Sequence, residues 1–159
     1  MIMDERLEFA DAVSVAAAAG TALIGDVIPL GSVGRDIGLG QPIYLVISVD
    51  TEIITGGSAG TLQFQLVSDA QAAIATDGTA TVHYASRLFV TDDSAANDTA
   101  MNAGQFPVVV ALPPEGPVYE AFLGILAVTA TTTTTAGKIN AFLTLDPPRD
   151  GRIYAEGAN

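Results

Sequence analysis

The chain has 159 residues, no cysteine, one histidine, and 18 acidic against six basic side chains, for a formal net charge of -12. Nucleic acids and anionic membranes attract cationic surfaces, so this charge argues against them as partners. It favours either solubility alone, as in many acidic proteins, or a positively charged protein partner. The lack of cysteine excludes disulfides, and a single histidine excludes the usual zinc and copper ligand sets. The length predicts one domain, residues 1–159, with a core that needs no covalent staples.

The N-terminal segment is predicted to be an arm that leads into a strand. Acidic residues in Met1–Arg6 stand where a signal peptide needs a basic segment, and Val13–Ala19 is too short to span a membrane, so we expect no targeting signal. The alanines of Phe9–Ala19 suit a helix, but the segment has no helical apolar stripe. We therefore expect an arm over residues 1–9 and favour extended structure over a helix in Phe9–Ala19.

Period-two alternation and short apolar runs predict about eight strands. Thr61–Leu66 is the clearest, because every second residue is apolar. Ile43–Val49 is apolar on both faces and predicts a central strand that is covered on both sides. The remaining strands are expected at Leu23–Leu30, Val82–Phe89, Phe106–Leu112, Tyr119–Ala130 and Ile139–Leu145, the last with Ile139, Ala141, Leu143 and Leu145 pointing inward.

Loops and turns separate these runs at fairly even spacing. Thr131–Thr135 is predicted to form the tip of a hairpin before the turn Ala136–Lys138. Thr91–Gly104 is polar and is expected to be a long exposed loop, and residues 147–159 are expected to be an extended C-terminal tail. The pattern predicts an all-β fold: a jelly-roll-like antiparallel β-sandwich with extended N- and C-terminal arms.

The candidate groups for chemistry do not form a recognisable active site. His83 lies in a predicted strand without an adjacent catalytic partner. The acidic residues of Thr91–Gly104 lack the order of a calcium loop. Glu115 and Glu120 suggest a glycosidase pair, but the chain has no tryptophan and only four tyrosines to hold a sugar. We therefore expect no enzymatic activity, no catalytic residues, no cofactor and no metal.

The segment Gly34–Gly40 combines Arg35 and Asp36 in a glycine-rich turn before the apolar strand. The two side chains either pair locally and cap backbone groups, or Arg35 reaches a partner protein through its planar fork of donors.

These residues carry a resemblance to a known family. Leu7–Ala12, Val27–Gly31, Arg35–Val46 and Ala136–Asp146 occur in the order found in capsid cement, or decoration, proteins of tailed bacteriophages, of the type in a short-tailed Bordetella phage. Together they cover about half of the chain. The long loop Thr91–Gly104 and the proline-rich Pro113–Pro117 differ from the family.

The resemblance implies a structural protein on the outer surface of the phage head that clamps adjacent major capsid subunits and forms homo-oligomers. A dimer is slightly favoured and a trimer stays open. Arms of such a protein supply apolar anchors and strand pairing to neighbours. The expected contacts with capsid or oligomer are Ile2, Leu7, Phe9, Arg35, Ile153 and Tyr154. The alternative is a head-fibre or receptor-binding sandwich that recognises glycans.

Overall fold

The computed structural model describes residues 5–31, 40–57, 59–92 and 97–148. Nine strands and two short 3-10 helices are formed by these residues. In chain order they are η1 (Glu5–Leu7), β1 (Glu8–Ser14), β2 (Gly20–Pro29), β3 (Tyr44–Thr55), β4 (Thr61–Asp69), β5 (Thr81–Ala85), β6 (Phe89–Val90), η2 (Thr99–Met101), β7 (Val108–Ala111), β8 (Phe122–Ala130) and β9 (Thr134–Thr144).

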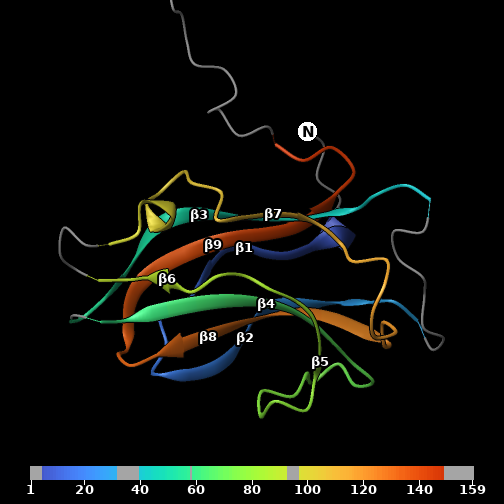
Figure 1. The fold of residues 1–159 in the computed structure, drawn as a ribbon, viewed down its shortest axis with the longest axis horizontal. Helices are drawn as coiled ribbons and strands as arrows, with labels where there is room; N and C mark the ends of the chain where they lie inside the picture. The colour runs from blue at the N-terminus through green and yellow to red at the C-terminus, as the bar shows by residue number, and fades with distance from the viewer. Residues whose placement is uncertain (1–4, 32–39, 58, 93–96, 149–159) are drawn as a thin grey trace, which may run out of the picture.

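The strands form two antiparallel sheets that pack face to face (Figure 1). Sheet A has the order β1-β9-β3-β7, and sheet B has the order β2-β8-β4-β5 with β6 paired to β4. With β6 left aside, successive strands alternate between the sheets except at the step from β4 to β5. This alternation is the strand order of a jelly roll, so the predicted fold class is confirmed.

The main core lies between the inner faces of the sheets. In β4, Leu62, Phe64 and Leu66 are at most 1% exposed, as their alternation with polar residues predicts. In β9, Ile139 and Ala141 are fully buried. Alternating apolar residues thus direct one face of each strand into the core.

The central position predicted for the strand at Ile43–Val49, which corresponds to β3, is also confirmed. β3 pairs with β9 on one side and β7 on the other. Leu45, Val46 and Ile47 point to alternating faces, and each is at most 1% exposed. Apolar residues at successive positions are therefore buried on both faces of this strand.

A second, smaller cluster covers the outer face of sheet B. The segment between β4 and β5 returns over the sheet and packs Ile74 against Val67 and Leu126. The Asp69 carboxylate accepts hydrogen bonds from the backbone N–H groups of Gln71 and Ala75, which hold the start of this segment and lower the pKa of Asp69. These bonds fix the start of the segment between β4 and β5 at this end of sheet B.

Three predictions about the last strand and the segment before it are wrong. Thr131–Thr135 is not a hairpin tip, because β8 belongs to sheet B and β9 to sheet A, so the chain crosses between the sheets there. Ala136–Lys138 is not a turn but lies within β9. Leu145 does not point inward: it follows the end of β9 and is 55% exposed.

The loop predicted at Thr91–Gly104 is partly buried in its described residues. It contains η2, whose Met101 is fully buried in the main core. The Asp98 carboxylate caps η2 by accepting from the N–H of Ala100, and it pairs with Arg87. Met101 therefore anchors this segment to the core, although the polar sequence of the segment predicted an exposed loop.

The N-terminal arm ends earlier than the sequence indicates. Glu8 and Phe9 belong to β1, which pairs with β9, so extended structure is confirmed for the start of Phe9–Ala19. Phe9 is 1% exposed and lies in the main core. Its assignment as an external contact is therefore wrong, because a buried ring has no surface to offer a partner.

Candidate functional site

A surface hollow lies where β2 ends and β8 begins. Pro29 and Phe122 are register partners there. We call this hollow the Tyr119 groove; its volume is about 650 Å³, and it is lined by Pro29, Gly31, Ala70, Val118, Tyr119, Glu120, Ala121 and Phe122. Most of these side chains are apolar, and the carboxylate of Glu120 is the one ionised group among them.

Three hydrogen bonds, one between backbone groups and two between a side chain and the backbone, hold the wall of the groove. The Tyr119 hydroxyl donates to the carbonyl of Pro113 at 3.1 Å, which closes the proline-rich loop on itself. The N–H of Leu30 donates to the carbonyl of Ala121 at 2.8 Å, and the N–H of Glu120 donates to Ser68 Oγ at 3.1 Å. The segment before β8 is therefore tied to both β2 and β4.

The Glu120 side chain is oriented by β5. Its Oε1 accepts a hydrogen bond from Thr81 Oγ1 at 2.6 Å. Thr81 is the first residue of β5, so the carboxylate lies close to the end of that strand. A carboxylate has about four acceptor positions, and this bond uses one of them.

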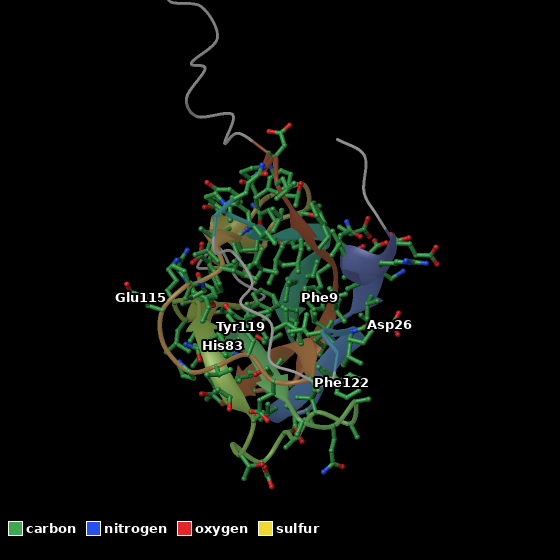
Figure 2. The ribbon with its side chains drawn as sticks, turned by 90° about the vertical axis from the view of Figure 1, so that its right-hand side faces the viewer. Phe9, Asp26, His83, Glu115, Tyr119 and Phe122 are labelled. Atoms are coloured by element: carbon green, nitrogen blue, oxygen red, sulfur yellow. The ribbon has the colours of Figure 1, made fainter. Side chains whose placement is uncertain are left out.

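The ring of His83 stacks on the ring of Tyr119 (Figure 2). Tyr119 is one of the described lining residues of the groove, and His83 is not. The ring centroids are 3.9 Å apart and the planes are inclined by 15°. Burial lowers the pKa of His83 below 6.5, while the charge of Glu120 acts in the opposite direction. Burial also raises the pKa of Tyr119 to about 12, so its hydroxyl stays a neutral donor.

Ser68, His83 and Glu120 together resemble a serine–histidine–acid set, but their arrangement does not suit catalysis. His83 Nε2 is 2.7 Å from Ser68 Oγ. The Ser68 hydroxyl is fully buried and already accepts from the Glu120 N–H, so a substrate has no access to it. A nucleophile must reach the reacting carbon, and this one packs inside the sheet. The three residues are better described as a structural network.

The rim of the groove carries one strongly exposed apolar side chain, Val118. Val118 is 73% exposed, the highest value among the exposed large hydrophobic residues of the described ranges. Glu115 lies in the same loop and projects into solvent (Figure 2). Val118 therefore adds apolar surface to the mouth of the groove.

A second hollow of about 300 Å³ lies beside η1 and β1. It is lined by Glu5, Glu8, Phe9, Ala10, Asp11, Val13 and Asp26. Figure 2 shows Asp26 on the opposite side of the molecule from His83 and Tyr119, with Phe9 between them. Four carboxylates gather there, so this side presents negative charge to its surroundings.

Few of the contacts predicted from sequence fall in described parts of the chain. Leu7 lies in η1 and is 37% exposed, so it is available to a partner. Ile2, Arg35, Ile153 and Tyr154 lie outside the described residues. The sequence did not indicate the Tyr119 groove; its one signal there was an apolar Val118 between Pro117 and Tyr119 in a proline-rich loop.

The acidic residues considered for calcium are engaged otherwise where they are described. Asp98 caps η2 and pairs with Arg87, and Asp92 is only 8% exposed. Asp93 lies outside the described residues. Within the described ranges, no helix has the length and apolar character to cross a membrane.

The fold and groove define a jelly-roll β-sandwich with a preformed apolar surface hollow. Comparison with protein families matches residues 9–143 to the Bbp16 family. The match covers most of the chain, from β1 to the end of β9, and the chain therefore belongs to this family of Bordetella phage proteins. A comparison with curated proteins found no match.

Proposed function

We propose that this protein is a capsid cement protein of a tailed bacteriophage. It binds the outer surface of the assembled head and clamps adjacent major capsid subunits, which stabilises the shell against the pressure of the packaged DNA. The observation that carries the proposal is the match to a phage protein family over residues 9–143, the whole of the jelly roll. Membership of this family by itself supports a structural protein of the phage.

The surface of the sandwich supports this role. The net charge of -12 and the four carboxylates beside η1 suit a basic protein partner. The Tyr119 groove and the exposed Leu7 offer apolar contact at two separate places. Contacts that are individually weak add up when many copies bind one shell.

The proposal includes self-association, with a dimer favoured over a trimer, and it includes neither catalysis nor a cofactor. The fully buried Ser68 hydroxyl supports the non-enzymatic role. Light scattering of the purified protein measures the oligomer directly. A monomer at micromolar concentration would remove self-association from the proposal and leave capsid binding to be tested separately.

The glycan-binding alternative has less support. Aromatic rings that bind sugars present an open face, whereas Tyr119 is 6% exposed and its ring is stacked on His83. A glycan array tests this alternative. Selective binding to one class of sugar would favour the receptor-binding function over the cement function.

The decisive experiment adds purified protein to heads from phage that lack it. We expect saturable co-sedimentation with the heads and a higher temperature of DNA release. If the protein stays in the supernatant at all concentrations, it is not a cement protein.

A further inference from the structure

We propose that the Tyr119 groove is the docking site for a partner segment that carries a lysine or arginine next to apolar residues. The inference rests on the proposed function, since the partner is then a protein of the head shell. Two features of the groove point to this chemistry: the apolar character of its described lining, and the acidic residue Glu120 among those lining residues.

The apolar lining requires an apolar contact. Val118 is 73% exposed at the rim, and the aromatic ring of Phe122 and the ring of Pro29 line the same hollow. Covering such side chains removes apolar surface from water, which favours association by about 25 cal/mol for each Å² buried. A purely polar segment would leave this surface without a matching contact.

The carboxylate selects the charge of the occupant. Glu120 is the one charged residue among the described residues that line the groove, and Thr81 satisfies one acceptor position of its Oε1. None of the basic residues in the described ranges lines the hollow, so no described part of the groove wall places a cation beside this carboxylate. A lysine or arginine side chain fits both features, because its aliphatic stem packs on apolar groups while its charged end reaches a carboxylate.

The groove is also organised before binding. Tyr119 is anchored by its hydrogen bond to Pro113 and by the stacked His83, and Glu120 is anchored through its N–H and its carboxylate. A preformed site loses little conformational entropy when the partner binds. We assign the occupant to a basic shell protein and not to a second copy of this chain, because this chain carries only six basic against 18 acidic side chains and so offers few cations to a carboxylate.

The test compares three variants with the wild type in binding to heads that lack the protein. Val118→Asp places a charge on the apolar rim. Glu120→Gln removes the negative charge but keeps an oxygen for Thr81, so the fold is preserved. Leu88→Asp is the matched control, since Leu88 is 58% exposed and lies outside the groove lining.

We expect Val118→Asp and Glu120→Gln each to weaken binding by roughly tenfold or more, and Leu88→Asp to change it less than about threefold. The affinity of Glu120→Gln should also depend less on salt than that of the wild type, because one charge pair is lost. If wild type binds and both groove variants behave like Leu88→Asp, the docking site is refuted and the cement function stands. If wild type does not bind, the cement function fails and the groove proposal falls with it.

A photo-crosslinker at position 118 identifies the occupant on the assembled head. We expect a crosslink to a shell protein, in a peptide that contains lysine or arginine beside apolar residues. A crosslink to a second copy of this chain, or to a peptide without a basic residue, would overturn the assigned partner chemistry.

Discussion

His83 and Tyr119 stack with ring centroids 3.9 Å apart, and the stack joins the edge strand β5 to the segment that enters β8. Ser68 of β4, the strand between them, contacts both sides: its Oγ lies 2.7 Å from His83 Nε2 and accepts from the N–H of Glu120. The stack therefore positions the wall of the Tyr119 groove.

Acidification should destabilise the protein through His83. The pKa of this group in the folded state is lowered from 6.5, mainly by burial, so the unfolded chain binds the proton more tightly. The fold favours the neutral form of His83. The stability that depends on this neutral form is fully present above about pH 6.5, and it is lost as the pH falls below that value. Thermal unfolding between about pH 7.5 and 5.5 measures the effect.

His83→Gln removes the one histidine of the chain and serves as the comparison. We expect the melting temperature of the wild type to fall more steeply over this range than that of the variant. Parallel pH profiles for the two proteins would contradict the proposed contribution of His83.

Removing the ring of Phe9 should destabilise the sandwich, although the residue lies near the N-terminus. Phe9 is 1% exposed in the main core, so Phe9→Ala should cost about 3–5 kcal/mol of unfolding free energy. Leu7→Ala is the control two residues earlier, where the side chain is 37% exposed and the expected cost is below about 1 kcal/mol. Chemical denaturation measures both. Equal losses would mean that Phe9 does not act as a core residue.

Gly25 should not tolerate a side chain. Its φ is +65°, and a Cβ there would overlap the carbonyl oxygen of Phe9, where β2 passes β1. Gly25→Ala should therefore cost about 3 kcal/mol or more, from left-handed strain and steric overlap together. Chemical denaturation measures the loss.

Gly78→Ala separates these two causes. Gly78 has a φ of +93°, but a Cβ at this position would meet no atom within 4 Å, so only the backbone cost of about 1 kcal/mol is expected. If the two substitutions destabilise the protein equally, the close approach of β1 and β2 is not what requires Gly25.

Asp98→Ala should cost more stability than Arg87→Ala. Asp98 caps η2 through the N–H of Ala100, and losing such a cap costs about 1–2 kcal/mol. Arg87 is 59% exposed in its pair with Asp98, so its charge is screened and its loss should cost less than about 1 kcal/mol. Urea unfolding measures both. A larger loss for Arg87→Ala would point to a contact of Arg87 other than the ion pair, which both variants lack; its guanidinium also lies 4.3 Å from the centroid of the Phe89 ring.

Local patterns in the sequence were enough to predict the fold class and the strands. The alternation of Leu62, Phe64 and Leu66 with polar residues places one face of β4 in the core, and the apolar run of Ile43–Val49 predicts a strand buried on both faces. These predictions succeed because side-chain direction along a strand depends only on the two-residue repeat of the backbone. The net charge of -12 likewise argued against nucleic acids and anionic membranes as partners, and the lack of cysteine excluded disulfides.

Which sheet each strand joins was decided only by the tertiary structure. Thr131–Thr135 has the composition of a hairpin tip, but β8 and β9 pair with partners far away in the chain, and the segment crosses between sheets. Phe9 looked like part of an arm because its burial comes from neighbours in other strands. The Tyr119 groove also escaped sequence analysis, since Pro29, Ala70 and Phe122 meet there only after β2, β4 and β8 have paired. Register between distant strands is a property of the whole core, so no local pattern encodes it.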